Sequence, residues 1–110
     1  MKLWIDDVRP APEGYVWCKS VNEAKSKICS AHRIYSNHWM DHIADADVIS
    51  VIDMDHDAGE YTHDGGDYIR LLDWIEETRG NYPIRIHSAN PVGVANMRRI
   101  IQRNNWKEVF

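Results

Sequence analysis

Apolar and polar residues alternate along this chain in blocks, and the longest apolar block leads directly into a charged cluster. Residues 48–59 read VISVIDMDHDAG, so a run rich in Val and Ile ends at Asp53, Asp55, His56 and Asp57. Such a run predicts a strand buried on both faces, as in a parallel sheet covered by helices. Carboxylates this close together repel one another, so we expect a cation, a basic group or shared protons beside them. A solvated acidic turn is the alternative interpretation of this stretch alone.

Four further stretches have the pattern of short strands. Residues 1–5 are followed at once by Asp6 and Asp7, so a second predicted strand ends in carboxylates. Residues 15–18 and 84–86 are predicted strands, and residues 106–110 are a candidate edge strand. Residues 8–14 (VRPAPEG) indicate a stiff loop, because they carry two prolines and a glycine. A parallel connection normally needs a helix, so either the first crossover helix is missing or the strand at 15–18 pairs differently.

Capping signals and periodicity predict helices in the first half of the chain. Ser20 and Glu23 form a capping box, and the helix that follows buries Val21, Ala24 and Ile28. A second helical stretch covers residues 32–45, where His38 and His42 lie one turn apart. Such a pair can chelate a metal, but without a third ligand nearby it is more often part of a packed or solvated helix face.

Two more helices are predicted in the second half. Residues 64–67, with Asp64 and Asp67, are expected to cap a helix that Gly80 terminates. Its buried stripe is formed by Tyr68, Leu71, Leu72 and Ile75. Asn90 as N-cap and Pro91 as first residue predict a last helix. That helix is expected to be buried through Val94, Met97, Ile100 and Ile101.

Strands that alternate with helices predict an α/β fold with a mostly parallel sheet of about five strands. We expect three layers, with helices on both faces of the sheet and the first crossover helix missing. The 110 residues suffice for one domain, residues 1–110, with a real core. This arrangement brings the carboxyl ends of the strands to one edge, where ligands of α/β proteins bind.

Composition narrows the classes of function. The formal net charge of −4 argues against a surface that coats nucleic acid and leaves room only for a local basic patch. The sequence has no apolar leader and no run of transmembrane length, so we expect a cytoplasmic protein without a membrane partner. Cys18 and Cys29 lack metal-site spacing and are predicted to be reduced thiols.

The candidate chemistry lies where the strands end. Asp6, Asp7, Asp55 and Asp57 supply hard oxygen ligands, which favour Mg²⁺ or Mn²⁺ over zinc. His87 and Ser88 follow the strand at 84–86 and precede a helix that starts at Asn90. The amides and positive end of that helix suit an anion such as phosphate. The sequence therefore predicts a metal site beside a phosphate site.

Three motifs give the chain a resemblance to known families. An acidic pair after the first strand, an aspartate after the central strand and a hydroxyl residue before alanine after the next resemble two-component receiver domains, whose fold is flavodoxin-like. The chain is more closely similar to the cyclic-phosphate-processing receiver-like family, through LWIDDVRP (residues 3–10), MDHDAG (54–59) and HSANPVG (87–93). Residues 32–45 then look like an insertion, and Asp53 is an unusual extra acid. The lysine that receivers carry after the fifth strand is missing, since Lys107 lies inside the last predicted strand.

This resemblance implies metal-dependent hydrolysis of a cyclic phosphate on a nucleotide or an RNA end. Asp6, Asp7 and Asp55 would hold Mg²⁺ or Mn²⁺, and Ser88 and Asn90 would bind the phosphate. His87 would protonate the leaving oxygen, and His56 or Asp57 would activate a water. The alternatives are a receiver-like signalling or interaction domain that binds metal or phosphate without turnover, and a phosphoacceptor receiver with Asp55 as the acceptor.

Overall fold

The computed structural model describes residues 1–36 and 44–110, except the side chains of residues 35 and 36. His38 and His42 therefore lie outside the described residues. Five strands form one sheet in the order β2-β1-β3-β4-β5, and every pairing is parallel. The strands are β1 (Lys2–Ile5), β2 (Tyr15–Cys18), β3 (Val51–Met54), β4 (Ile84–Ile86) and β5 (Glu108–Val109). The receiver-like strand order and the parallel sheet are as expected, including the short strand at residues 15–18 and the edge strand near the C-terminus.

The helices of the described residues occur between the later strands. They are α1 (Val21–Ser36), α2 (Asp45–Val48), the 3-10 helix η1 (Gly59–His63), α3 (Ile69–Glu77) and α4 (Pro91–Arg103). The connection from β1 to β2 holds no helix, which confirms that the first crossover helix is missing. Ser20 Oγ accepts from the Glu23 amide at 3.0 Å, and Asn90 Oδ1 accepts from the Gly93 amide at 3.0 Å. Both predicted N-caps are therefore confirmed.

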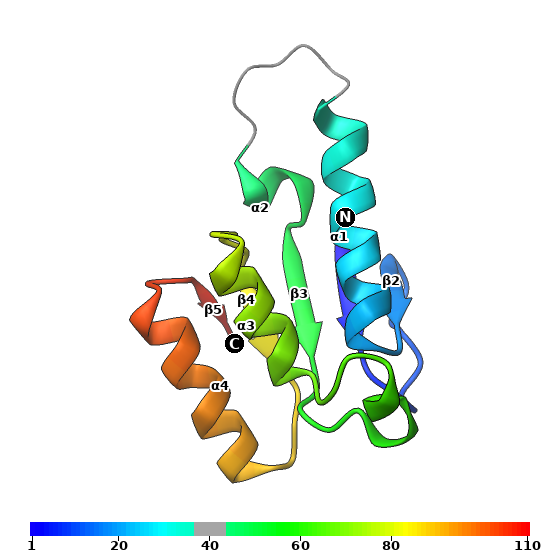
Figure 1. Ribbon diagram of the computed structural model, residues 1–110, viewed down its shortest axis with the longest axis vertical. Helices are drawn as coiled ribbons and strands as arrows, with labels where there is room; N and C mark the ends of the chain where they lie inside the picture. The colour runs from blue at the N-terminus through cyan, green and yellow to red at the C-terminus, as the bar shows by residue number, and fades with distance from the viewer. Residues whose placement is uncertain (37–43) are drawn as a thin grey trace.

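The sheet carries its helices on one face only, so the expected third layer is absent from the described residues. Figure 1 shows α1, α3 and α4 together in front of the strands. The reason is topological: the steps from β2 to β3, β3 to β4 and β4 to β5 all run in one direction across the sheet. Right-handed crossovers in one direction place their helices on the same face. The step from β1 to β2 runs the other way, and it is the step without a helix.

The core lies between the sheet and these helices. Leu3 and Ile5 of β1, Ile52 and Met54 of β3 and Ile84 of β4 have no exposed surface. The predicted stripe of α3 packs onto them, and its members Tyr68, Leu71, Leu72 and Ile75 are fully buried. Since successive side chains of a strand point to opposite faces, the residues between these core positions lie on the face without helices.

Several predicted boundaries were wrong. The central strand begins at Val51 rather than at 48, because Asp45–Val48 forms α2 and the Ile49 amide bonds to the Asp45 carbonyl at 2.9 Å. Residues 32–36 end α1 instead of starting a separate helix. The helix after residue 67 ends at Glu77, and Arg79, not Gly80, takes the positive φ of 59° behind it.

The predicted cap of α3 was also wrong. Asp64 Oδ2 accepts from Ser20 Oγ at 2.6 Å, and Asp67 Oδ1 accepts from the Ala58 amide at 3.0 Å. No side chain caps α3 at Tyr68. Both carboxylates instead fix the loop that crosses the carboxyl edge of the sheet, where long-range partners compete with local capping.

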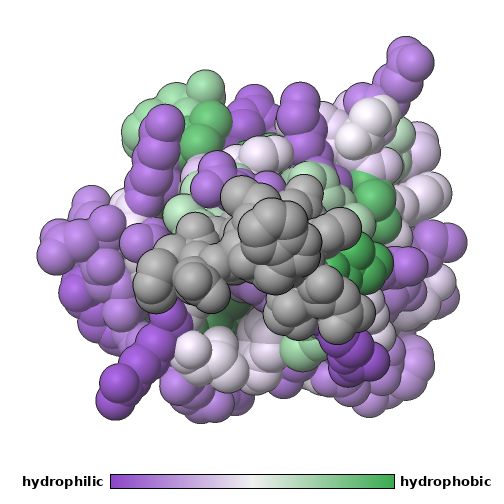
Figure 2. Space-filling view, turned by 90° about the horizontal axis from the view of Figure 1, so that it is seen from above, coloured by the Kyte–Doolittle hydropathy of each residue, from purple (hydrophilic) through white to green (hydrophobic). Residues whose placement is uncertain are grey.

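Cys18 is buried and Cys29 is exposed, and both thiols are free, as predicted. No helix among the described residues is long and apolar enough to cross a membrane. The strand arrows of Figure 1 point away from the end seen in Figure 2, where most of the visible surface is hydrophilic. The carboxyl edge of the sheet, with the candidate residues, lies at the opposite end.

Candidate functional site

Three carboxylates meet at the carboxyl edge of the sheet, just beyond β1 and β3. Asp6, Asp7 and Asp55 each offer an oxygen within 4.8 Å of the oxygens of the other two. Asp6 is buried, and Asp7 and Asp55 are partly exposed. We call these residues the acidic triad. The prediction that Asp57 joins them was wrong, because the side chain of Asp57 is exposed and bonds elsewhere.

Asp6 is the fixed member of the triad. Its Oδ1 accepts from the amides of Val8 and Arg9 at 2.9 and 2.8 Å, and its Oδ2 lies 2.9 Å from Nε2 of His87. Burial alone would raise the pKa of Asp6, but these hydrogen bonds outweigh it and lower the pKa. The loop after β1 therefore folds around an ionised carboxylate.

The pKa of Asp7 is shifted in the opposite direction. Burial, together with the negative charges of Asp6 and Asp55, raises the pKa of Asp7 above its ordinary value. Gly59 packs against it closely, since a Cβ at Gly59 would lie 2.3 Å from Asp7 Oδ2. Gly59 also has a φ of 54°, a conformation that glycine adopts readily. Only glycine fits this point of the DHDAG loop without a shift of Asp7.

A chain of charged side chains runs from the face of the sheet without helices into the triad. Arg85 Nη1 donates to Asp53 Oδ2 at 3.0 Å, and Asp53 Oδ1 lies 2.6 Å from His87 Nδ1. His87 Nε2 continues the chain to Asp6. Trp4 covers the imidazole ring, with the two rings 3.9 Å apart and 6° from parallel. The extra acid Asp53 thus has two basic partners, as its burial requires.

His87 is held on both of its nitrogens. Burial alone would lower the pKa of His87, but hydrogen bonds and charge interactions with Asp53 and Asp6 raise it above the ordinary value. Only 8% of the side chain is exposed. Both nitrogens therefore donate to carboxylates, and His87 is an imidazolium enclosed between them.

A second histidine lies on the outer side of the triad. His56 Nδ1 lies 2.9 Å from Asp57 Oδ1, and the His56 amide donates to Asp55 Oδ1 at 2.7 Å. The ring packs against the first turn of α4, where a Cβ at Gly93 would lie 2.5 Å from His56 Cγ. Asn90 Nδ2 approaches the Asp57 carboxylate at 3.4 and 3.5 Å. The structure therefore places these predicted residues together, next to Asp55.

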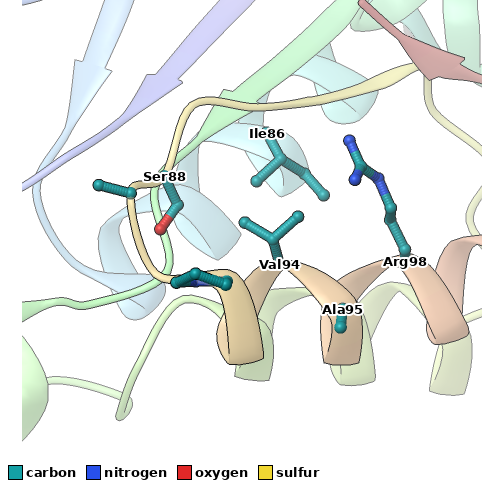
Figure 3. Close-up of a pocket in the computed structure, with 7 residues that line it drawn as sticks. Ile86, Ser88, Val94, Ala95 and Arg98 are labelled. Carbon is teal, nitrogen blue, oxygen red and sulfur yellow. The ribbon is translucent and has the colours of Figure 1, made fainter.

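Ser88 lies apart from the triad. Its Oγ accepts from the Asn90 amide at 3.1 Å. It lines a pocket of about 620 Å³ between β4 and α4, together with Ile86, Val94 and Arg98 (Figure 3). Since His87 contacts Trp4 and Asp53 on the face of the sheet without helices, the neighbouring residues 87 and 88 face opposite sides. None of the triad residues lines this pocket.

The donor set of the triad fits a hard divalent cation. Three carboxylate oxygens near one another, with a raised pKa at Asp7, leave negative charge that a cation would neutralise. Mg²⁺ and Mn²⁺ prefer such oxygen ligands, whereas zinc sites typically contain nitrogen or sulfur. Asp6, Asp7 and Asp55 are the residues that could hold it.

Sequence reasoning missed Trp4, Arg85 and the two close glycines, Gly59 and Gly93. Alternation along the strands was the available signal. Asp53 has the opposite parity to Ile52 and Met54, so its side chain had to leave the core. The register then places Asp53 beside Trp4 of β1 and Arg85 of β4.

Comparison with known proteins identifies one match. The family model described as cyclic-phosphate processing receiver domain matches residues 1–103. The match therefore includes the acidic triad, His56, His87 and all of α4. No curated protein and no solved structure matches the chain.

Proposed function

The chain belongs to the family of cyclic-phosphate processing receiver domains, and on this premise we propose that it hydrolyses a cyclic phosphate on a nucleotide or an RNA end with the aid of a divalent cation. The observation that carries the proposal is the acidic triad, whose oxygens lie within 4.8 Å of one another. A phosphodiester is anionic, so three neighbouring carboxylates without a cation would repel it. A cation that the triad binds removes this repulsion and makes the edge of the sheet a phosphate site.

Asp6, Asp7 and Asp55 would hold Mg²⁺ or Mn²⁺. When bound, such a cation supplies a Lewis acid for a phosphoryl oxygen and a water of lowered pKa. Asp6 is held in place by two amides and His87, so its orientation is set before any ligand arrives. Asp55 is oriented by the amide of His56.

His56 is the group we assign to proton transfer. We assign His56 the tautomer in which Nδ1–H donates a hydrogen bond to the Asp57 carboxylate, which leaves Nε2 able to accept a proton from water. The water oxygen then bonds to phosphorus, and the bond from phosphorus to one ribose oxygen breaks. His56 returns the proton to that leaving oxygen. Asp57 orients the ring and stabilises the imidazolium.

His87 takes a different role from the one expected. Both of its nitrogens donate to carboxylates, so we assign it to positioning Asp6 rather than to protonating the leaving oxygen. Substituting His87 by Gln should weaken Mn²⁺ binding, measured by calorimetry, more than it lowers the melting temperature. A purely structural role would change both in proportion.

Asn90 is the N-cap of α4 and Ser88 lies two residues before it, and we propose that these residues and the first turn of α4 bind the non-bridging phosphate oxygens. Asn90 Nδ2 already lies near the carboxylate of Asp57. Pro91 has no N–H and the Gly93 amide donates to Asn90 Oδ1, so the Val92 amide and the positive end of the α4 dipole would meet the anion. Ser88 Oγ is turned toward the α4 side, so it would act at the margin of the site.

The test is turnover by purified protein with Mg²⁺ or Mn²⁺. We expect release of nucleoside monophosphate from 2′,3′-cyclic or 3′,5′-cyclic nucleotides, measured by chromatography. Asp55→Asn should reduce the rate by at least about 10²-fold. Asp47→Asn is the matched control, because Asp47 is exposed in α2 at the other end of β3.

Two outcomes would overturn the proposal. Absence of turnover across the panel, with Mn²⁺ still binding to the triad, would leave a receiver-like domain that binds metal without catalysis. Acid-labile phosphate incorporated from acetyl phosphate, and lost in Asp55→Asn, would identify a phosphoacceptor.

A further inference from the structure

The face of the sheet without helices carries aromatic and basic side chains rather than a polar cover. Its residues alternate with the core positions and are joined in register across the strands. They are Lys2 and Trp4 of β1, Tyr15 and Trp17 of β2, Val51 and Asp53 of β3, Arg85 of β4 and Val109 of β5. We call this surface the open face.

The aromatic rings of the open face form a connected group. Trp4 pairs in register with Trp17, and its ring meets Tyr15 edge to face with centroids 6.1 Å apart. All three rings are partly exposed. None of them belongs to the hydrophobic core or to the residues packed against it. Rings with this exposure lie where an aromatic ligand could stack on them.

Cations accompany these rings. Lys2 Nζ lies 5.5 Å from the Tyr15 ring centroid, and Lys19 Nζ lies 4.6 Å from the Trp17 ring centroid. Arg85 is exposed on the same face. The acid in this group, Asp53, is 2% exposed and is bonded to Arg85 and His87. The open face is therefore positive on a chain whose net charge is −4.

The open face is continuous with the acidic triad. Trp4 stacks on His87, and His87 bonds to Asp6. Trp17 Nε1 donates to the Asp6 carbonyl at 2.7 Å. A linear polymer bound along these rings would therefore extend as far as the acidic triad.

From these features we propose that the open face binds single-stranded nucleic acid, whose bases stack on Trp4, Tyr15 and Trp17 and whose phosphates meet Lys2, Lys19 and Arg85. This inference rests on the proposed function, because it makes the substrate an RNA strand with its terminal phosphate at the triad. Aromatic rings interleaved with cationic side chains are typical of surfaces that bind single-stranded nucleic acid. A second copy of the chain fits less well, since its face would bring Lys2 and Arg85 against the same charges.

The test measures binding apart from catalysis. The probe is a labelled single-stranded oligoribonucleotide of about 12 nucleotides with a 3′-hydroxyl end, titrated in EDTA and followed by fluorescence anisotropy. We expect Tyr15→Ala to weaken binding by about 5- to 100-fold through loss of stacking. Lys19→Glu should also weaken binding. It should lower the slope of log Kd against log salt concentration by about one, which corresponds to the loss of one phosphate contact.

Matched controls come from other surfaces. Lys27→Glu changes an exposed lysine of α1, and Phe110→Ala removes an aromatic ring that is 88% exposed beside Arg98. Both should bind the oligonucleotide as the unmodified chain does. If Lys27→Glu weakens binding as much as Lys19→Glu, the effect is one of net charge and the proposal is wrong.

The remaining outcomes separate the two proposals. Hydrolysis of cyclic mononucleotides without oligonucleotide binding would overturn the open-face proposal and leave the proposed function standing. Binding that is lost in Tyr15→Ala, without any hydrolysis, would support the open face and overturn the proposed function. A dimer in sedimentation equilibrium that Tyr15→Ala dissociates would instead assign the face to a second copy.

Discussion

Asp6 and Asp7 are adjacent in the chain, yet their carboxylates contribute to stability with opposite signs. Hydrogen bonds from Val8, Arg9 and His87 favour the ionised form of Asp6, whereas burial and like charges disfavour that of Asp7. In EDTA at neutral pH, Asp7→Asn should raise the free energy of unfolding by up to about 1 kcal/mol. Asp6→Asn should lower it by about 2 kcal/mol, because its amide group would face the N–H of His87. Thermal unfolding of both variants, followed by circular dichroism, checks the signs, and equal shifts would contradict the described geometry.

His87 permits a second prediction at the residue scale. In His87→Ala, Asp53 and Asp6 would remain buried without the cation between them. Breaking a buried ion pair in this way costs roughly 3–5 kcal/mol. Urea unfolding at pH 7 should show that the free energy of unfolding falls by this amount in His87→Ala. It should fall by less in His87→Gln, which keeps a hydrogen-bond donor. His63→Ala, at an exposed histidine of η1, is the control. A loss below about 1 kcal/mol in His87→Ala would mean that the carboxylates find other partners.

Residue types alone were enough to find the acidic triad, because strand ends in parallel sheets share an edge. The role of His87 could not be predicted in the same way. Its partner Asp53 is 34 positions away in the chain, and their 2.6 Å contact exists only in the folded register. Asp57 was misassigned because sequence proximity to Asp55 does not fix the direction of a side chain in a loop.

At the scale of elements, α3 and α4 are joined by a partly exposed hydrogen-bonded cluster. Arg103 donates to Glu76 at 2.7 and 2.8 Å, and Asn104 also donates to it. These bonds lower the pKa of Glu76 to about 2. The folded state therefore holds the proton less tightly than the unfolded chain does. The stability from this cluster is present above pH 4.5 and declines as pH falls from there toward 2.

Glu76→Gln tests this linkage. The variant should melt at a lower temperature than the unmodified chain at pH 7, and the difference should shrink steadily between pH 4.5 and 2. Glu77→Gln, one position along on an exposed side of α3, serves as the control. A difference that stays constant over this pH range would show that Arg103 and Asn104 do not bind Glu76 in solution.

Element types were predictable where periodicity and caps agreed. The helix begun by Ser20 and the helix begun by Asn90 both start at the predicted residue. The start of α3 was not predictable, since Asp64 and Asp67 bond to Ser20 and Ala58 across the loop. A short apolar stretch is ambiguous between helix and strand, which is why Val48, the last residue of α2, was assigned to the central strand.

At the scale of the whole molecule, the strands differ in how firmly the sheet holds them. β1 and β3 have neighbours on both sides, whereas β5 has two residues and lies at an edge. Native-state hydrogen exchange should therefore be slowest for amides of β1 and β3 and fastest, among the strands, for β5. Two-dimensional NMR in D₂O measures this order. Amides of β5 as slow as those of β3 would indicate that another chain covers this edge.

The number of layers was predicted wrongly, because it depends on where each strand lies in the sheet. Strand order together with the right-handed rule places every helix of the three long crossovers on one face. That rule needs the position of each strand in the sheet, which short apolar runs such as residues 15–18 do not give. The pattern of exposed aromatic residues, Trp4, Tyr15 and Trp17, follows directly from the missing first helix.

Alkylation of the two free thiols can be used to time the opening motions of the folded chain. Burial raises the pKa of the Cys18 thiol to about 12, so in the closed molecule it is both shielded and almost wholly protonated. Cys29 is exposed and reacts at once with an alkylating reagent. The delay between the two alkylation events, resolved by mass spectrometry, is therefore the waiting time for an opening that exposes Cys18, by separation of β2 from the sheet or of α1 from β2. Because β2 carries Tyr15 and Trp17, a bound oligonucleotide should lengthen that delay, and this reports occupancy without any label on the protein.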